Sequence, residues 1–483
     1  MEQRNLIMAV VASITILLGW QFLYEQPRLD KEMAARKAAQ QQAGKNNPQT
    51  SQNLQSSQMT KGPTVPAPGP QSATPSVPGS GAMIPAAPVV GIPLKPKGPS
   101  RSSIIKGAKR VQINSKRLIG SIKLKGGQID DLVFTKYYET IDPNSPTITL
   151  LSPTGAENPY YAQFGWVASD SGIKLPTSET NWNTDQSTLS PNKPIRLSWD
   201  NGQGLKFIRT ITLDENYMFS ITQSVENNSN KAVTLFPYGL VSRTGTPEVL
   251  GFFILHEGLL GVFNGQLKEI DYDDLQESKN ISQRSTGGWI GITDKYWLTA
   301  LIPNQTSNIQ TNFRHNLQDK ADKYQVDYLG DAKTIGPGSS VSVNNRLFAG
   351  AKEVKLLDAY EEKLGISRFD LAIDFGWFYF LTKPIFYVLM WFADHIGNYG
   401  LAILLLTILI KIFFFPLANK SYRAMSKLKQ LQPKMTKIRD RHKNDRAKMN
   451  EAMMQLYKTE KVNPAAGCFP MLIQIPVFFA LYK

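Results

Sequence analysis

Lys411 is the one charged residue in an apolar run that covers residues 399–417. About 20 apolar residues let a helix cross the hydrocarbon of a bilayer. An ionised side chain at the centre of such a helix costs about 2.5–3.5 kcal/mol, so it usually faces water or a partner. Pro416 lies one to two turns further on, roughly 7–8 Å along a helix, so the ammonium could also reach the membrane interface. The position therefore predicts either a hydrated cavity or a snorkelling cation.

Two polar side chains in the apolar runs are further candidate site residues. Thr407 precedes Lys411 by one helical turn and shares its face, although a threonine hydroxyl inside a helix commonly bonds its own backbone. Gln474 lies near Pro476 in a later apolar run, residues 465–482, where its amide can bond a neighbouring helix with about 1–2 kcal/mol. Both side chains could instead line a polar cavity.

A basic segment separates these two apolar runs. Residues 418–463 contain 13 Lys and Arg but 4 Asp and Glu, and this surplus supplies most of the chain's net charge of +15. Short basic loops beside membrane spans stay on the cytoplasmic side. Direct reading of DNA is a poor explanation, because the segment lies between two apolar runs. Ribosomal RNA and anionic lipid headgroups are polyanions that such a loop can contact.

Apolar side chains recur every three or four residues within the basic segment, and polar residues 441–445 interrupt the pattern. This spacing predicts two amphipathic helices folded into a hairpin. The stripes are expected to pack on each other, and their methionines can also offer an adaptable surface to varied apolar segments. The first stripe is Met425, Leu428, Leu431, Met435 and Ile438, and the second is Met449, Met453 and Leu456.

Composition bounds the remaining chemistry. With 42% hydrophobic residues and a mean hydropathy of −0.25, the chain must combine a few spans with a large water-exposed part. Cys468 is the only cysteine, so an internal disulfide is excluded, and no group of Cys and His has zinc-site spacing. Cys468 is expected to be a packing residue at a helix start, and no metal or cofactor is expected.

The first hundred residues predict an anchor and a tether. Residues 6–24 are apolar but end in bulky side chains where a signal peptidase needs small ones, which indicates an uncleaved signal anchor. Residues 27–102 hold 13 of the 30 prolines among Gln, Ser, Ala and Gly. Such a composition buries too little apolar surface to fold and predicts a flexible tether.

Residues 103–358 change to alternating apolar and polar side chains. Around Asp214, the pairs Leu205 and Phe207, then Phe219 and Ile221, follow a period of two. This period and the turn residues between the runs predict half-buried strands of an antiparallel sandwich, closed by a short helix at residues 353–363.

Residues 375–396 leave the topology open. They are rich in aromatic side chains, but Lys383-Pro384 interrupts the middle, and Asp374 and Asp394 stand at the ends. This pattern favours a helix lying in the headgroup plane, which would put the sandwich outside and the N-terminus inside. If the segment crosses the membrane instead, the sandwich lies inside. The charges that flank the first apolar run do not decide between these arrangements.

The sequence from residue 397 onward resembles the Gram-negative form of the YidC/Oxa/Alb family of membrane-protein insertases. The similar stretches are GNYGLAILLLTILIKIFFFPLANKSYRAM, LQPKM, and EAMMQLYKTEKVNPAAGCFPMLIQIPVFFALY, in which VNPAAGCFP is specific. Residues 253–265 and 287–303 resemble parts of the family's large periplasmic domain. The resemblance covers the chain except for the tether.

This resemblance implies a multi-pass α-helical inner-membrane protein with a large all-β periplasmic domain (a β-supersandwich) and a cytoplasmic helical hairpin. It implies an insertase and chaperone for nascent membrane proteins that works alone or with the Sec translocon through a hydrophilic, cationic groove. Ribosome and anionic lipids are expected partners of the hairpin. The predicted groove residues are Lys411, Gln474 and Thr407, and the predicted contacts along the client path or hairpin are Cys468, Met425, Met435, Met449 and Met453.

Two departures from the family pattern bear on the site. The family usually carries Arg where this chain has Lys411, so bidentate grip on a carboxylate is lost while attraction remains. The family also continues through further spans beyond the position of Lys483, so we expect a shortened chain or an incomplete sequence, in which the groove is not complete.

Two other functions fit parts of the sequence. A membrane-anchored carbohydrate-active or carbohydrate-binding protein would use His256, Glu257 and Asp294 of the sandwich, and a scaffold would recruit other complexes without inserting clients. No phosphate-binding G-x-x-x-x-G-K-[ST] motif is present, so nucleotide hydrolysis is not expected. The predicted segments are a signal anchor (1–26), a tether (27–102), the β domain (103–358), a linker with the surface helix (359–396), a span (397–417), the basic hairpin (418–464) and a third span (465–483).

Overall fold

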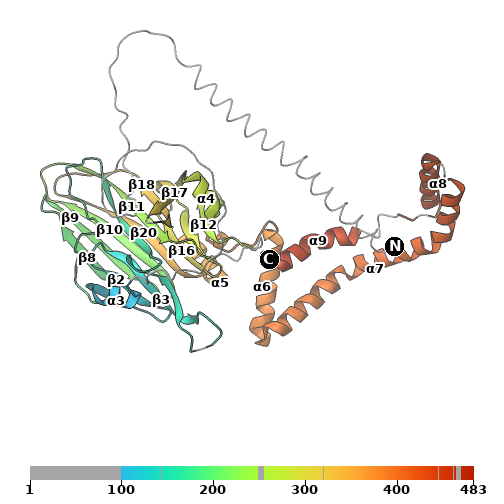
Figure 1. Ribbon diagram of the computed structural model, residues 1–483, viewed down its shortest axis with the longest axis horizontal. Coiled ribbons are helices and arrows are strands. Elements are labelled where there is room, and N and C mark those ends of the chain that lie inside the picture. Colours follow the sequence, from blue (N-terminus) through green and yellow to red (C-terminus); the bar gives the residue numbers. More distant parts are fainter. Residues whose placement is uncertain are drawn as a thin grey trace, which may run out of the picture. The chain divides into compact units, whose positions relative to one another are not determined.

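The computed structural model describes residues 99–142, 144–248, 255–318, 320–443, 445–460, 462–463 and 469–483. The predicted signal anchor, nearly all of the tether and Cys468 lie outside these residues. A short helix, α3 (Arg101–Lys106), precedes a β domain, and helices follow it (Figure 1). The side chain of Ser100 accepts a hydrogen bond from the amide of Ser103 and starts α3 two residues inside the predicted tether.

The first sheet of the β domain has 11 strands among the described residues. Its main path runs β14-β17-β18-β11-β5-β3-β2-β1-β7, with β19 beside β11 and β4 beside β3. The strands are β1 (Arg110–Asn114), β2 (Leu118–Lys123), β3 (Gln128–Tyr138), β4 (Thr147–Leu151), β5 (Tyr160–Ala168), β7 (Thr188–Leu189), β11 (Val233–Thr244), β14 (Asn280–Thr286), β17 (Asn308–Gln318), β18 (Ala321–Gly330) and β19 (Lys333–Ile335).

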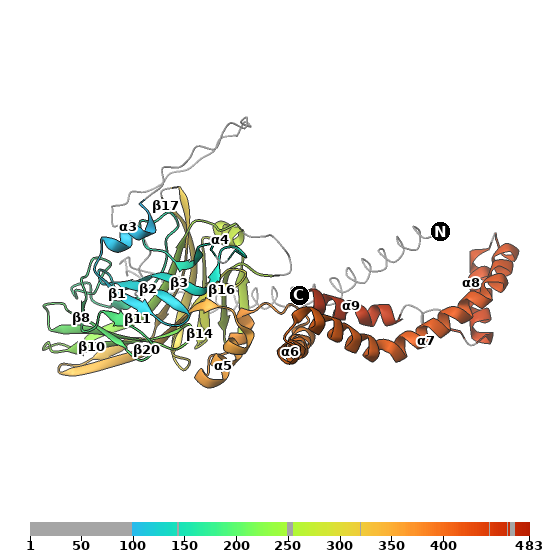
Figure 2. The same ribbon diagram turned by 90° about the horizontal axis from the view of Figure 1, so that it is seen from below.

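The second sheet has nine strands within the described part of the chain. Their order is β13-β12-β15-β16-β20-β10-β9-β8-β6. The strands are β6 (Asn183–Thr184), β8 (Ile195–Asp200), β9 (Leu205–Leu213), β10 (Met218–Asn227), β12 (Gly258–Phe263), β13 (Gln266–Ile270), β15 (Trp289–Thr293), β16 (Trp297–Ile302) and β20 (Ser339–Ala351). A helix, α4 (Tyr272–Ser278), follows β13. Figure 2 shows the β domain from below.

The β9–β10 hairpin shows how the alternating pattern becomes a sheet. Phe219 pairs with Leu213, and Val225 pairs with Phe207, so apolar side chains of both strands share one face. At the turn, the carboxylate of Asp214 accepts hydrogen bonds from the amides of Asn216 and Met218, each at 2.9 Å. The strands and the turn predicted here are confirmed.

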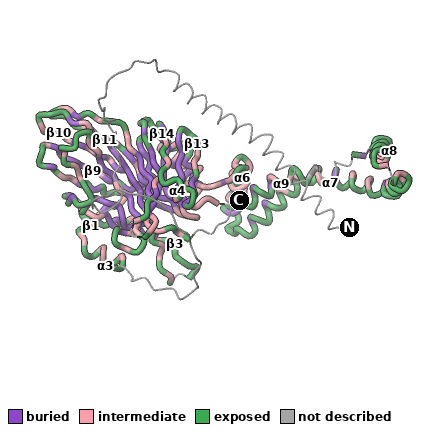
Figure 3. Tube along the Cα trace, turned by 45° about the horizontal axis from the view of Figure 1, so that its top comes forward, coloured by how far each residue is buried: buried purple, intermediate pink, exposed green. Residues whose placement is uncertain are grey.

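The main hydrophobic core lies between the two sheets. Phe134 of β3 and Val326 of β18 enter it from the first sheet, and Phe219 of β10 and Phe348 of β20 enter it from the second. All four side chains are fully buried, and the buried parts of the chain in Figure 3 coincide with the strands. The predicted large β-rich domain is therefore confirmed.

Two short elements end the β domain and four helices follow among the described residues. The helix α5 (Val354–Leu364) crosses the predicted domain boundary at residue 358, and the 3₁₀ helix η2 (Phe369–Ala372) comes next. The later helices are α6 (Tyr379–Ile396), α7 (Tyr399–Arg441), α8 (Arg446–Thr459) and α9 (Phe469–Tyr482).

One helix boundary differs from the prediction, at Pro416, and a second proline lies inside a helix. The helix α6 runs through Pro384, and α7 runs through Pro416 into the basic segment, so neither proline ends its helix. A proline removes one backbone donor, and its neighbours can retain helical geometry around that gap. Among the described residues, α7 is the one helix long and apolar enough to cross a membrane, while residues Met471–Tyr482 form a shorter apolar helix. The multi-pass arrangement stays a prediction.

Candidate functional site

The junction between α6 and α7 positions the predicted site. Gly397 ends α6 with a φ of +73°, a left-handed conformation that glycine adopts without steric cost, and its amide donates to the carbonyl of Ala393 at 2.8 Å. Asn398 then starts α7 by accepting a hydrogen bond from the amide of Leu401 at 3.2 Å. The Gly-Asn pair therefore encodes a sharp turn between two helices.

Small side chains are among the buried residues of the apolar helices. The helix α6 contacts α7 and α9, and α7 contacts α9. Ala393 of α6, Ala402 of α7 and Ala480 of α9 are all buried. Small residues let helix backbones approach closely when no hydrophobic effect drives their association. Phe378, which precedes α6, adds a ring stack on Phe479 with centroids 6.1 Å apart.

Lys411 faces away from these helix contacts. It lies nine positions after the buried Ala402, which is about 180° around an α-helix. Its side chain is exposed, and within the described ranges it forms no hydrogen bond or ion pair. Its neighbours Ile412 and Phe413 are also exposed. The face of α7 that carries the cation is therefore not covered by α6 or α9.

The other predicted groove residues are not joined to Lys411. The hydroxyl of Thr407 donates to the carbonyl of Ile403 at 2.8 Å, so it bonds its own helix, and its residue is exposed on the Lys411 side. Gln474 is half-buried on α9. In the described part of the chain, no hydrogen bond connects Lys411, Thr407 and Gln474. The groove stays a prediction.

The basic segment folds into two helices, as its spacing predicts. The chain turns after Arg441, and the carboxylate of Asp445 accepts hydrogen bonds from two amides at the start of α8, each at 3.1 Å. The hydroxyl of Tyr457 contacts the sulfur of Met435 at 3.9 Å, and Lys434 pairs with Glu460 at 2.6 Å. Of the predicted hairpin methionines, Met435, Met449 and Met453 are half-buried, and Met425 is exposed.

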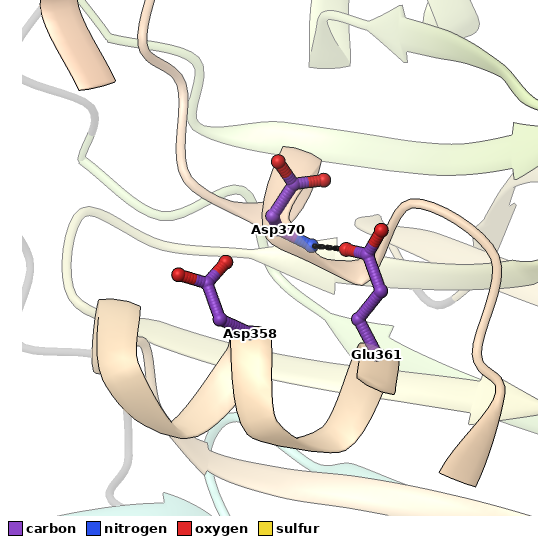
Figure 4. Close-up of side chains that lie close together, drawn as sticks. All are labelled: Asp358, Glu361 and Asp370. Atoms are coloured by element: carbon purple, nitrogen blue, oxygen red, sulfur yellow. Dashed lines mark hydrogen bonds between the residues drawn. The ribbon is translucent and has the colours of Figure 1, made fainter. Parts of the chain in front are cut away.

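Three carboxylates that the sequence analysis did not single out meet at the end of the β domain. Asp358 and Glu361 come from α5, and Asp370 comes from η2 (Figure 4). One oxygen atom from each lies within 4.8 Å of the others. Asp358 and Glu361 are three residues apart and share a helix face, which is the signal that could have indicated part of this cluster.

An ammonium group pairs with two carboxylates of this cluster. The Nζ of Lys383 on α6 lies 2.9 Å from an oxygen of Asp358 and 2.8 Å from an oxygen of Asp370. It also lies 3.1 Å from the hydroxyl of Tyr379. These three acceptors match the three N–H donors of an ammonium. Although three carboxylates suit a hard cation, this arrangement is a charge-compensated joint between α5, η2 and α6.

The pKa values of Glu361 and Asp370 in this joint are shifted in opposite directions, by burial and by hydrogen bonding respectively. Burial raises the pKa of Glu361, whose carboxylate accepts the amide of Asp370 at 3.0 Å. For Asp370 burial also opposes ionisation, but hydrogen bonds from Lys383 and Tyr379 outweigh it and lower its pKa. The shift of Asp370 therefore supports its ion pair with Lys383.

The candidate acids of the sandwich have structural partners. The carboxylate of Asp294 pairs with Arg243 at 2.6 Å, and Glu257 accepts the amide of Lys295 at 3.0 Å. His256 pairs with Asp271 at 3.2 Å. The fold brings Glu257 close to the Asp294 loop, which spacing did not reveal. These partners hold the loops of the β domain and explain the polar groups without a reaction.

A large β domain joined to apolar helices, one of them long enough to span a bilayer, defines a membrane protein with a large water-exposed domain. Residues 110–388 match the model of the YidC periplasmic domain, and residues 391–483 match that of the 60Kd inner membrane protein family. The chain belongs to the YidC family of membrane protein insertases.

Individual relatives agree with this assignment. The chain is 45% identical over 494 residues to "Membrane protein insertase YidC" of Methylorubrum extorquens (strain PA1), covering 100% of this chain and 76% of the relative. It is 41% identical over 480 residues to the protein of the same description from Rickettsia bellii (strain OSU 85-389), covering 99% of this chain and 78% of the relative. A galactose mutarotase-like protein from Lactobacillus casei ATCC 334 has 12% identity and a TM-score of 0.34, covering 50% of this chain and 99% of that one.

Proposed function

We propose that this insertase moves clients into the inner membrane along the Lys411 face of α7. In this proposal Lys411 is a cation in a hydrated groove that attracts polar or acidic parts of an arriving chain. Gln474 and Thr407 contribute polar groups, and Cys468 lies near the client path. The apolar segment of the client leaves sideways into lipid. The same face acts as a chaperone while the client folds.

The observation that carries this proposal is a cation in a membrane-length helix on a face that the neighbouring helices leave open. The buried alanines place α6 and α9 on one side of α7, and Lys411 lies on the other. A charge at this depth is stabilised by water or by an opposite charge. A client carboxylate about 4 Å from the ammonium gains about 4 kcal/mol at an effective dielectric constant of 20.

The continuity of α7 supports the proposed topology. Its apolar half begins directly after α6, and its basic half forms the first arm of the hairpin. If residues 399–417 cross the membrane, α6 and the hairpin lie on opposite sides. Because the matched family model is that of a periplasmic domain, we place the β domain and α6 on the periplasmic side. The hairpin and the N-terminus are then cytoplasmic.

The cytoplasmic hairpin is proposed to contact polyanions and apolar client segments. Its surplus of positive charge suits ribosomal RNA and anionic lipid headgroups, which are both near that membrane face. Exposed Met425 and Met454 offer flexible apolar contacts beside that charge. The Sec translocon is the proposed partner for clients with long translocated loops. We propose no covalent chemistry, because client partitioning supplies the driving force.

Site-specific photocrosslinking during client synthesis tests the groove. A photoreactive residue is placed at Lys411, at Gln474, and at exposed Leu405 as a control about 120° around α7 from Lys411, in a chain that carries all spans of the family. We expect adducts with the nascent apolar helix from positions 411 and 474. Absence of adducts from both, with adducts from Leu405, contradicts the proposal.

Substitution of the cation tests its charge. Lys411→Ala is expected to reduce insertion of a client with acidic flanks about tenfold, while Lys411→Arg retains most activity because it keeps the charge. Lys427→Ala, an exposed lysine of the hairpin, serves as the control. Client integration is measured by protease protection in membrane vesicles. Equal insertion by Lys411→Ala and the control would favour a scaffold that does not insert clients.

A further inference from the structure

The helix α6 presents one polar stripe to the end of the β domain. The stripe begins at Tyr379 and continues 4, 8 and 15 positions later with Lys383, Tyr387 and Asp394. At 100° per residue these four positions lie within about 80° of one another around the helix. The hydroxyl of Tyr387 donates to Asp358, and that of Tyr379 donates to Asp370. At the other end of the stripe, Asp394 pairs with Lys355 of α5 at 2.6 Å.

The joint at Lys383 is shielded from solvent. The side chain of Lys383 is 19% exposed, and that of Asp370 is 4% exposed. Removing the ammonium would leave the carboxyl groups of Asp358, Asp370 and Glu361 close together with less positive charge beside them. Breaking a partly buried charge pair by removing one partner is costly, because the remaining charge has lost its solvent and its partner.

The domain side of the joint is fixed in the hydrophobic core. Phe369 precedes Asp370 in η2 and is fully buried. Its ring packs edge-to-face on Trp289 of β15 at 5.5 Å and on Phe348 of β20 at 5.4 Å. The carboxylate that receives Lys383 is therefore held by the core, one residue away from a buried ring.

The helix side of the joint leads directly to the site. Ala393, near the end of α6, is buried in the region where α6 meets α7, and Gly397 turns the chain into α7. A continuous series of packed or bonded groups thus connects the core of the β domain with the helix that carries Lys411.

We propose that Lys383 is a positioning residue for insertion, which clamps α6 to the β domain and so sets where α7 stands beside the client. The clamp consists of Lys383 with its acceptors Asp358 and Asp370, and the hydroxyls of Tyr379 and Tyr387. Because this role rests on the proposed path along α7, its test must separate loosening of the clamp from failure of the groove.

The first variant removes the clamp's charge in the full chain. Lys383→Met removes the cation that Asp358 and Asp370 share and leaves Arg368, 3.7 Å from Asp370, as the remaining cation near that carboxylate. We expect amides of α6 to exchange hydrogen about tenfold faster while those of β20 do not change. Client insertion should fall with it. The triple change Lys383→Met with Asp358→Asn and Asp370→Asn removes both partners, and it should restore much of the protection and of the insertion. Lys363→Met, an exposed lysine at the end of α5, is the matched control.

A milder variant keeps the proposal testable if Lys383→Met fails to fold. Tyr387→Phe removes one hydrogen bond to Asp358 and leaves the ion pairs of Lys383 in place. It should speed amide hydrogen exchange in α6 alone. Unchanged exchange of α6 in every folded variant overturns the clamp. Faster exchange with full client insertion overturns the positioning role. Absence of photoadducts from a photoreactive residue at position 411, in a chain whose clamp residues are unchanged, would instead refute the groove.

Discussion

The β domain and the helices that follow it differ in how far their apolar side chains are exposed. In the β domain, aromatic and aliphatic residues such as Phe134 and Phe348 are fully buried between two sheets. In α7, Phe413 is 78% exposed, and exposed apolar residues continue along the helix and into α9. In water, such exposed apolar surfaces would make the protein prone to aggregation. The contrast indicates two solvents, water around the domain and lipid around the apolar parts of α7 and α9.

The two regions also differ in how they handle polar groups. The β domain buries charges and gives them internal hydrogen-bond partners, as with Arg209, whose two guanidinium Nη groups donate to the carbonyls of Gly127 and Phe164. Burial lowers the pKa of Arg209 to about 10, which leaves it charged at neutral pH. In the apolar half of α7, by contrast, Lys411 has no partner within the described residues. A cation without a partner in the second region is where function is expected.

The largest expected effect concerns the buried cation of the β domain. Arg209→Met keeps most of the volume but orphans two carbonyls, at about 1–3 kcal/mol each, so the free energy of unfolding should fall by about 4 kcal/mol. Arg209 also stacks on Trp182 at 4.8 Å, so urea unfolding of the full chain in detergent can be followed by tryptophan fluorescence. Arg196→Met, an exposed arginine of β8, should leave the midpoint unchanged. Equal midpoints for both variants would contradict the internal role of Arg209.

The next effect compares the same substitution in the two regions. Ile403 of α7 is 53% exposed and Ile119 of β2 is 45% exposed, so burial alone predicts similar tolerance. Ile403→Asp should cost about 2–3 kcal/mol because its surroundings are lipid, whereas Ile119→Asp should stay within about 1 kcal/mol. Protease access to the basic hairpin from the periplasmic side reports whether α7 has crossed. Equal tolerance at both positions would remove the distinction between the two solvents.

The smallest effect lies at the joint between the regions. Because burial raises the pKa of Glu361, the folded chain holds this proton more tightly than the unfolded chain, and stability is lost as the pH rises above the usual carboxyl range. Glu361→Gln should therefore raise the melting temperature by roughly 1–3 °C at pH 8 and have no effect near pH 4. Thermal unfolding at the two pH values measures this. Glu362→Gln, at an exposed neighbour, is the control, and a uniform shift at both pH values would exclude the proton linkage.

Local patterns predicted the elements whose causes are local. The alternation around Asp214 indicated the β9–β10 hairpin, because a period of two and a turn residue act within a few positions. Polar residues 441–445 likewise indicated the break between α7 and α8. Pro416 misled, because neighbouring backbone bonds keep α7 intact around one missing donor.

The clamp could not be predicted in the same way. Its charged members stand at positions 358, 370 and 383, and no single helical or strand period relates them. The repeat of Tyr379, Lys383 and Tyr387 could have indicated a polar stripe, but not the carboxylates that face it. A pair of charges distant in sequence meets only after the core has placed Phe369 and η2.

The amino-acid sequence by itself determined the class of the protein, because hydropathy, charge and turn residues act over short distances. It encoded a β domain, a membrane-length helix with one cation, and a basic hairpin. Only the tertiary structure decided that the Lys411 face of α7 is turned away from α6 and α9, and that Lys383 joins α6 to the domain. Those arrangements depend on which surfaces pack together, and packing joins residues that no short pattern relates.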